Sequence, residues 1–556
     1  MHNDQLVVDS LRFLSAYAVQ KANSGHPGLP LGAAPMAYSL WGKYLNINPK
    51  DRDWINRDRF ILSGGHGSAL LYSLLHMYGF DLTIEDLKNF RQIGSKTPGH
   101  PEYGHTDGVE ATTGPLGQGI SMAVGMAIAE TNLAARYNKD DIKLIDHYTY
   151  AICGDGDLME GIGYEALSLA GTLGLDKLII LYDSNSITID GGTDISFTED
   201  INKRFEACNF QVIEVKNGND LDAISKAIEE AKAEKNKPTL IKITTQIGYG
   251  VPKKVGKSSA HGEPLGDENI LEMREFLNWN YDEFVVPEEA YEITKMQLSE
   301  KSKAYDNWKE LEKEYSEKYP KEYSNLKRAL NRELPEDLFN EDFFKFEKDV
   351  ASRAASGDVL NRISKKVDYL MGGSADLAGS NKTTLEGIDF YSKENRLGRN
   401  MHFGVREHAM AAIGNGMALH GGVIPYVATF LIFSDYLKGA MRLSALMGVP
   451  LIYVLTHDSI GVGEDGPTHQ PIEQHSMIRA LPNINFFRPA DAVETAYAWK
   501  IAVESKKTPT ALALTRQTLP LLEGTGEGVE KGGYILSKEN DELDIILMAS
   551  GSEVQY

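Results

Sequence analysis

The chain contains 556 residues with a mass of 61.5 kDa, a length that predicts three or four domains and excludes a single small binding module. Apolar residues make up 42% and charged residues 24%, which indicates a globular protein with several cores and excludes a disordered chain. The formal net charge is −22 and no dense run of lysine and arginine occurs, so we expect no nucleic-acid and no membrane partner.

Cysteine content and the amino terminus point to a cytoplasmic protein. Cys153 and Cys208 are the only cysteines, which is too few for a disulfide framework and favours a reducing compartment. The first residues predict an amphipathic helix and not a signal peptide, because no basic segment precedes the apolar ones. The most apolar window, residues 409–433, is interrupted by polar residues and a proline, so we expect a buried helix and a strand there.

Strand-like apolar runs alternate with helical patterns, which predicts parallel sheets covered by helices on both faces. In the first half we expect strands at 148–154, 177–183, 210–215 and 239–245. A segment dense in charged residues follows at 301–334, where aromatic residues recur at helical spacing, and it predicts a solvated helical connector. The alternation then resumes with runs at 368–377, 422–433, 449–457, 483–489 and 510–516, followed by a linker-like stretch and one hairpin-like piece near the end.

The strongest chemical signal is GDGDLMEG at 154–161, directly after one expected strand, together with YDSNSITIDG at 182–191 after the next. Ligands of open parallel sheets bind outside the carboxyl ends of the strands, which is where both segments fall. Asp155, the side-chain oxygen of Asn185 and the carbonyl of Ile187 would offer three oxygen ligands to Mg²⁺ or Ca²⁺. The glycines would also let a diphosphate approach the backbone. The alternative is a pair of turns that only cap helices.

Four histidines of the first half stand next to glycine, namely His26, His66, His100 and His261. Glycine neighbours indicate loops in which a histidine can reach a ligand, although a structural hydrogen bond is the alternative for each one. A zinc hydrolase site is a second alternative, but no HExxH or Cys/His spacing accompanies the set. The glycine-rich TTGPLGQG at 112–119 opens a predicted helix whose free N–H groups would face a ligand, unless it is only a turn.

These motifs resemble those of the transketolase family of thiamine diphosphate enzymes. The GDG and Asn185 pair is similar to the family's cofactor motif, and THDSIGVGEDGPTHQPIE at 456–473 and HFGVREHAM at 402–410 are similar to further transketolase segments. The resemblance implies an α/β fold with two consecutive parallel-sheet domains of the thiamine diphosphate-binding type and the start of a third α/β domain. It implies a homodimer whose active sites lie at the subunit interface. The expected divisions are a diphosphate-binding domain at 1–300, a helical connector at 301–334, a pyrimidine-binding domain at 335–525, and the start of a truncated carboxyl-terminal domain at 526–556.

The resemblance also implies which residues contact the cofactor and its metal. Asp155, Asn185 and the Ile187 carbonyl would hold the metal ion. The implied cofactor-binding residues are His66, Gly114, Leu116, Gly156, Asn185, His261, Phe430, Phe433 and Tyr436. Glu407 in GVREH resembles the family's catalytic glutamate. A carboxylic acid hydrogen-bonded to the cofactor's pyrimidine ring would favour its imino form, and burial would let the carboxyl keep its proton near pH 7. The alternative for Glu407 is a glutamate at a helix start that pairs with Arg406. The alternative for Phe430, Phe433 and Tyr436 is that these aromatic residues only fill the core.

Substrate contacts follow from the same resemblance. Arg353, Ser380, His457 and Arg516 would surround the phosphate end of a sugar phosphate, and His26, His100, Asp465 and His469 would line its hydroxyls. His26, His100, His261 and His469 are also expected to act in catalysis by relaying protons. The implied reaction is that of the pentose phosphate pathway, in which a two-carbon ketol unit moves from a ketose phosphate such as xylulose 5-phosphate to an aldose phosphate such as ribose 5-phosphate or erythrose 4-phosphate. The alternatives are another ketol transferase such as dihydroxyacetone synthase, which the arginine pair disfavours, and a truncated non-catalytic assembly or binding protein.

Overall fold

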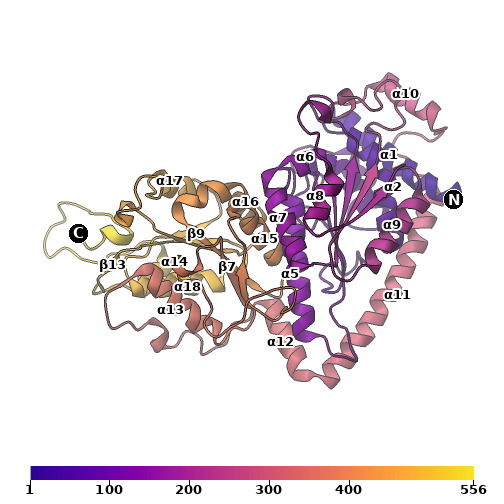
Figure 1. Ribbon diagram of the computed structural model, residues 1–556. Helices are drawn as coiled ribbons and strands as arrows, with labels where there is room; N and C mark the ends of the chain where they lie inside the picture. The colour runs from indigo at the N-terminus through magenta and orange to yellow at the C-terminus, as the bar shows by residue number, and fades with distance from the viewer. Residues whose placement is uncertain (1) are drawn as a thin grey trace. The chain divides into compact units, whose positions relative to one another are not determined.

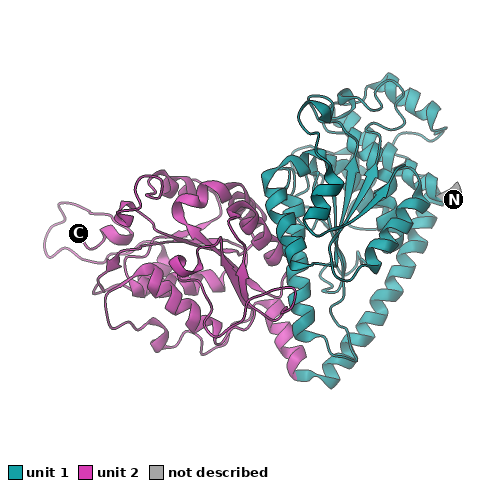
Figure 2. Cartoon of the chain, viewed as in Figure 1, with its two compact units in different colours: residues 1–320 teal, residues 321–556 magenta. Residues whose placement is uncertain are grey.

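The computed structural model describes residues 2–556, and the chain divides into two compact units, residues 1–320 and 321–556 (Figures 1 and 2). Each unit is built around one parallel sheet with helices packed on it. The division falls within the charged segment that the sequence predicts to be helical. That segment is part of two helices, α11 (Glu288–Lys318) and α12 (Pro320–Asn331).

The first unit contains a sheet of five parallel strands in the order β1-β2-β3-β5-β4. The strands are β1 (Arg59–Leu62), β2 (Thr149–Gly154), β3 (Leu178–Ser184), β4 (Gln211–Val215) and β5 (Thr239–Thr244). Every residue of β1 and β2 is buried, as expected for a parallel sheet covered on both faces. Gly154 at the end of β2 is in register with Asp183 of β3, so the two loops that follow these strands start side by side.

Helices cover this sheet because their apolar residues recur along one face. In α9 the buried residues include Ile224, Ala227, Ile228 and Ala231, and the Asp220 side chain caps the helix by accepting from the Ala223 N–H at 3.0 Å. The helices of this unit besides α11 are α1 (His2–Ala22), α2 (Gly28–Ser39), α3 (Ser68–Met77), α4 (Ile84–Lys88), α5 (Gln118–Tyr137), α6 (Asp155–Met159), α7 (Gly161–Leu173), α8 (Ile201–Ala207), α9 (Leu221–Ala233) and α10 (Asp267–Phe276).

The second unit contains a sheet of six parallel strands in the order β11-β12-β10-β9-β7-β8. Their bounds are β7 (Leu370–Ser374), β8 (Asn400–His402), β9 (Ile424–Phe430), β10 (Ile452–Thr456), β11 (Asn485–Phe487) and β12 (Thr510–Leu514). A short antiparallel pair, β6 (Val350–Ala351) and β13 (Thr518–Leu519), lies outside this sheet. The expected window at 409–433 is a buried helix followed by a buried strand, as predicted.

Two layers of helices pack on the second sheet (Figure 1). One layer pairs α13 with α18, whose apolar residues share a core with β7, β9, β10 and β12. The other pairs α15 with α16. The helices are α13 (Ser352–Ser364), α14 (Ala378–Asn381), α15 (Glu407–His420), α16 (Ser434–Met447), α17 (Glu473–Arg479) and α18 (Ala492–Glu504). Within residues 2–556, no helix is long and apolar enough to cross a membrane.

The hairpin expected near the end of the chain is wrong. Residues 532–550 contain neither helix nor strand, and only 3₁₀ turns flank them, at Glu527–Lys531 and Gly551–Glu553. Leu547 and Met548 are 85% and 91% exposed, so nothing within residues 2–556 packs on their side chains. An isolated hairpin is marginal in water without an apolar surface to pack on, which explains why the apolar pattern alone does not produce one.

Candidate active site

The loops after β2 and β3 meet at Asp155, which begins α6. Its carboxylate is buried, with the residue 5% exposed. The Tyr182 hydroxyl donates to Oδ1 at 2.5 Å, and the Ser186 backbone N–H donates to Oδ2 at 3.1 Å. Burial raises the pKa of Asp155, and no lysine, arginine or histidine of the described chain forms an ion pair with it. A buried carboxylate without a cationic partner fits a cation site.

Asn185 and Ile187 lie on the loop that touches Asp155. The Asn185 side chain donates Nδ2 to Asp183 at 2.9 Å and accepts the Ile187 N–H on Oδ1 at 3.0 Å. Asp183 is itself held by a hydrogen bond from the Thr245 hydroxyl. A carboxylate, an amide oxygen and a backbone carbonyl on adjacent segments are a donor set that hard divalent cations prefer. Among residues 2–556, no group of three or more His, Cys, Asp or Glu side chains is arranged for a metal, so the zinc alternative gains no support.

Asp157, which the sequence argument missed, joins three segments of this site. It is fully buried and accepts the Gly117 N–H at 2.9 Å, the Ser63 hydroxyl at 2.7 Å and the Gly154 N–H at 3.0 Å. Gly117 has a φ of +76° and is the residue before α5, so the carboxylate fixes the start of that helix against the GDGD loop. Asp157 is the second aspartate of the GDGD motif, and this position in the motif is the sequence feature that could have indicated its role in joining the three segments.

Two glycines allow the expected cofactor residues to approach one another. A Cβ at Gly156 would lie 2.8 Å from Leu116 Cδ1, so the Leu116 side chain rests against the GDG loop. Gly114 has a φ of +132°, and a Cβ there would lie 3.0 Å from the His100 ring. The TTGPLG segment therefore contacts both the GDG loop and one of the four histidines.

The four glycine-flanked histidines form one cluster in the first unit. The His26 ring centroid lies 5.2 Å from that of His66, 6.4 Å from that of His100 and 5.7 Å from that of His261. Burial lowers the pKa of His26 to about 4 and of His66 to about 3, and it also lowers the pKa values of His100 and His261. The rings are therefore neutral at pH 7. Nδ1 of His26 and of His261 are buried without a hydrogen-bond partner, which fits a ligand that binds there.

A cavity of about 190 Å³ lies elsewhere in the first unit. Aromatic rings, including Trp41, Phe60 and Tyr103, line it together with the ion pair of Arg57 and Glu110. None of the expected site residues lines it. The titratable and glycine-flanked residues gather instead at the carboxyl ends of the strands, where ligands of open parallel sheets bind.

Aromatic residues gather at the carboxyl end of β9 in the second unit. The Phe430 and Phe433 rings are nearly parallel, with centroids 5.8 Å apart and planes inclined by 11°. His457, directly after the neighbouring strand β10, places its ring 3.7 Å from that of Phe430, and the His469 ring lies 5.4 Å from that of Phe433. Tyr436 is 6.0 Å from Phe433 and remains 64% exposed. Exposure of this ring fits a pocket wall better than a filled core.

Arg353 and His457 are brought together in this unit. Arg353 lies at the start of α13, donates Nη1 to the Ser380 carbonyl at 2.9 Å, and approaches Nε2 of His457 to 3.4 Å. Burial, and then the charge of Arg353, lower the pKa of His457 to about 4. Arg353 thus contacts two of the other three residues expected at the substrate phosphate, Ser380 and His457.

Arg516, the fourth, follows β12 and approaches the loop at 460–466. It donates to the Val462 carbonyl at 2.7 Å and to Glu464 at 2.6 Å. The hydrogen bond from Arg516 lowers the pKa of Glu464 to about 2, and the charge of Asp465 also acts on Arg516. Glu464 was not predicted, although it precedes Asp465 in GEDG.

Glu407 is the first residue of α15, the helix that packs against α16 and β9. Partial burial raises the pKa of its carboxyl above the ordinary value. A raised pKa favours the protonated form, which can donate a hydrogen bond. Arg406, the residue before it, donates to the Phe403 carbonyl at 2.9 Å.

Two α/β units, each built on a parallel sheet, are typical of a thiamine diphosphate-dependent enzyme. Asp155 and the histidine cluster lie on loops of the first unit, and an aromatic cluster and a glutamate with a raised pKa lie in the second. Comparison with known families agrees: the thiamine diphosphate binding domain of transketolase matches residues 3–335, and the pyrimidine binding domain of transketolase matches residues 348–521. The chain belongs to the transketolase family, and it is a ketol-transferring enzyme that uses thiamine diphosphate.

Individual transketolases align with nearly the whole of this chain in sequence and in structure. The transketolase of Bacillus subtilis is 56% identical over 98% of this chain and 83% of its own length, and that of Halalkalibacterium halodurans is 55% identical over 100% and 84%. A crystal structure of transketolase from Pichia stipitis in complex with sedoheptulose 7-phosphate superposes with a TM-score of 0.97 at 47% identity, over 100% of this chain and 83% of that one. Transketolase from Leishmania mexicana gives a TM-score of 0.94 at 46% identity, over 97% and 81%.

Proposed function

We propose that the chain transfers a two-carbon ketol unit from a ketose phosphate to an aldose phosphate as a homodimer. Each active site would combine the first unit of one subunit with the second unit of its partner. The observation that carries this proposal is the division of the expected residues into two groups, one per unit. The first unit contains Asp155, Asn185, Ile187 and the histidine cluster, and the second contains the aromatic cluster, Glu407 and the two arginines. Neither group alone contains everything that a cofactor and a sugar phosphate need.

For the cofactor, Asp155, Asn185 and the Ile187 carbonyl would bind Mg²⁺ or Ca²⁺, and the metal would bind the diphosphate. His66, His261 and the backbone of Gly156 would donate hydrogen bonds to the phosphate oxygens, Gly114 and Leu116 would hold the cofactor in a bent form, and Phe430, Phe433 and Tyr436 would face its pyrimidine ring. When bound, thiamine diphosphate supplies the electron sink for carbon–carbon bond cleavage and formation.

The proton transfers belong to the chain's own residues. Glu407 would hold a proton on its carboxyl and donate a hydrogen bond to the pyrimidine ring, because partial burial raises its pKa. His26, His100, His261 and His469 would exchange protons with the substrate hydroxyls. The lowered pKa values of His26, His100 and His261 support this role, because a neutral imidazole at pH 7 has a free lone pair.

The phosphate end of the substrate would lie against Arg353 and Arg516, with Ser380 and His457 beside them and Asp465 and His469 along the sugar. Guanidinium groups suit a phosphate because they donate hydrogen bonds in pairs. Structures of Pichia stipitis transketolase with sedoheptulose 7-phosphate and with fructose 6-phosphate support this substrate class.

We further propose the functional divisions 1–300, 301–334, 335–525 and 526–556 stated above. We also propose a cytoplasmic location, which the two free cysteines support.

A coupled assay with xylulose 5-phosphate and ribose 5-phosphate tests the proposal. We expect turnover that requires both thiamine diphosphate and Mg²⁺. The same assay with formaldehyde as acceptor separates the reaction from that of a dihydroxyacetone synthase. Tight cofactor binding with no turnover for any acceptor would instead favour a non-catalytic binding protein.

A further inference from the structure

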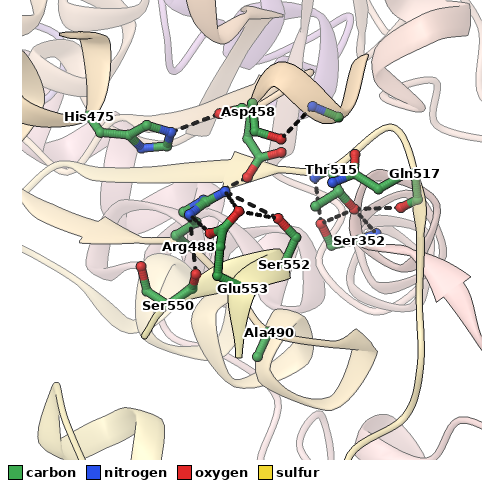
Figure 3. A network of polar contacts seen from close by, with 12 residues as sticks. Ser352, Asp458, His475, Arg488, Ala490, Thr515, Gln517, Ser550, Ser552 and Glu553 are labelled. Carbon is green, nitrogen blue, oxygen red and sulfur yellow. Dashed lines mark hydrogen bonds and ion pairs between the residues drawn. The ribbon is translucent and has the colours of Figure 1, made fainter. Parts of the chain in front are cut away.

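Figure 3 shows a polar cluster around Arg488 in the second unit. One of its members, Asp458, directly follows the proposed substrate residue His457 in the sequence. Arg488 directly follows β11, and its side chain is only 11% exposed. Its Nε donates to Oδ2 of Asp458 at 2.7 Å, and the Asp458 side chain is fully buried. The Glu553 carboxylate accepts from both terminal nitrogens of the same guanidinium. The buried arginine therefore bridges two carboxylates from distant parts of the chain.

The segment 550–553 contacts Arg488 through its backbone and its side chains. The terminal nitrogens of Arg488 also donate to the Ser550 carbonyl and to the Ser552 hydroxyl, each at 3.2 Å. All five N–H groups of Arg488 thus have a partner. Gly551 has a φ of +65°, and a Cβ there would lie 2.6 Å from Cγ of Arg488. Only glycine lets the backbone lie this close to the arginine stem in this conformation.

Asp458 connects the cluster to His457. Three hydrogen bonds hold Asp458 in place. Its N–H donates to the Leu514 carbonyl at 3.2 Å, its carbonyl accepts from Nε2 of His475 at 2.7 Å, and its carboxylate accepts from Nε of Arg488. The residue before it, His457, has a φ of +63°, which is unfavourable for a residue with a side chain. Such a conformation persists only where the surroundings hold it. It directs the His457 ring onto Phe430 and beside Arg353.

We propose that Arg488 and Glu553 are positioning residues for substrate binding. They hold Asp458, and through it they hold the left-handed backbone of His457 that places its ring at the sugar phosphate. This inference rests on the proposed function for the role of His457. Arg488 also balances the charge of a buried carboxylate, since without it Asp458 would be buried without a cation.

The variant Glu553→Gln keeps the shape of the side chain and removes its charge. We expect a three- to tenfold higher KM for xylulose 5-phosphate, with kcat and cofactor affinity within twofold of the unmodified chain. Glu530→Gln is the matched control, because Glu530 is similarly exposed and pairs with Lys500 in the same unit. A purely structural role of Glu553 would lower the melting temperature and the active fraction of Glu553→Gln and leave its KM equal to that of the Glu530→Gln control. That result would overturn the proposal.

Variants of Arg488 test the same positioning role, because Arg488 contacts both Glu553 and Asp458. Arg488→Lys keeps one charged contact to Asp458 and should raise KM less than Arg488→Met, which removes the charge. Hydrogen exchange measured by mass spectrometry gives a readout without turnover. We expect faster exchange of the Asp458 and Ser459 amides in Glu553→Gln and not in Glu530→Gln. Unchanged exchange would overturn the proposal even if the chain proves inactive.

A double-mutant cycle separates this inference from the proposed function. His457→Ala should raise KM, and adding Glu553→Gln to it should have no further effect, because the glutamate acts through the histidine. An unchanged KM in His457→Ala would refute the proposed role of His457. A raised KM in His457→Ala together with an independent, multiplicative effect of Glu553→Gln would refute only the positioning role.

Discussion

The His66 and His261 rings lie stacked, with centroids 5.1 Å apart and planes inclined by 19°. His66 follows β1, whereas His261 follows the 3₁₀ turn at Ser258–Ala260, so the fold brings together two distant segments. Two imidazolium ions at this separation would repel each other. Burial lowers both pKa values, and that of His66 reaches about 3, so the pair is neutral at pH 7 and can donate N–H groups to an anion.

The histidine cluster predicts acid sensitivity of the cofactor-free protein. His66 has an ordinary pKa of 6.5 when unfolded and about 3 when folded, so as pH falls from 6.5 the unfolded state binds the proton first. The stabilising effect is complete above pH 6.5 and is lost as the pH falls towards the folded value. We expect His66→Asn to reduce the slope of unfolding free energy against pH by about 1.4 kcal/mol per pH unit near pH 5.

Urea denaturation at pH values between 7 and 4.5 measures this slope. His105→Asn is the control, because His105 is exposed and lies outside the cluster. Its slope should match that of the unmodified chain. Equal slopes for all three proteins would show that His66 is not buried in its neutral form.

Asp155 offers a test of the cation site. Asp155→Asn keeps an acceptor for the Tyr182 hydroxyl but removes the charge, so thiamine diphosphate should lose its Mg²⁺-dependent binding. The cofactor-free variant should be as stable as the unmodified chain or more so, because burial raises the pKa of Asp155 and therefore disfavours its charged form. Calorimetry measures both effects. Asp190→Asn, an exposed change in the same loop, should bind normally. Unchanged affinity in Asp155→Asn would place the metal elsewhere.

Glu407 is tested by proton exchange at C2 of the bound cofactor. Glu407→Gln should bind thiamine diphosphate but exchange this proton orders of magnitude more slowly, because an amide is a far weaker acid than a carboxyl. Quenched-flow exchange read by proton NMR gives the rate. Glu473 also begins a helix and is exposed, so Glu473→Gln is the matched control. Near-normal exchange in Glu407→Gln would remove its proposed role.

Arg516 is tested by substrate selectivity. Arg516→Ala should raise KM for phosphorylated donors at least tenfold and barely affect hydroxypyruvate, because the guanidinium would contact the phosphate and not the reacting carbon. Steady-state kinetics with both donors measures this ratio. Arg442→Ala, at an exposed arginine of the second unit, should change neither KM. Equal losses with both donors would indicate that Arg516 only secures Val462 and Glu464.

The dimer proposal predicts linked assembly and cofactor binding. A hundredfold excess of thiamine diphosphate over its Kd, with Mg²⁺ present, should stabilise the fold by about 2.7 kcal/mol. Sedimentation velocity should show a dimer under the same conditions. A cofactor-saturated sample that sediments as a monomer, or that shows no thermal shift, would contradict the combination of two subunits in one site.

Local patterns in the sequence determined most strands of both sheets. The expected strands at 148–154, 177–183, 210–215 and 239–245 correspond to β2, β3, β4 and β5, because buried parallel strands are continuous apolar runs. The short strands β1, β6, β8 and β13 were missed, since two to four residues carry too little periodicity. The position of GDGD after a strand also indicated the edge of the sheet where a cation site was expected.

Only the tertiary structure decided which side chains meet. The pairing of Arg516 with Glu464 and the bridge from Glu553 through Arg488 to Asp458 leave no local signal in the sequence. The apolar run near Leu547 shows the converse, because it predicted a hairpin that has no surface to pack against. The spacing of apolar residues in a sequence indicates whether one face of a segment can be buried. Which other segment covers that face, and which charged side chain lies next to a given arginine or carboxylate, depends on how distant elements pack.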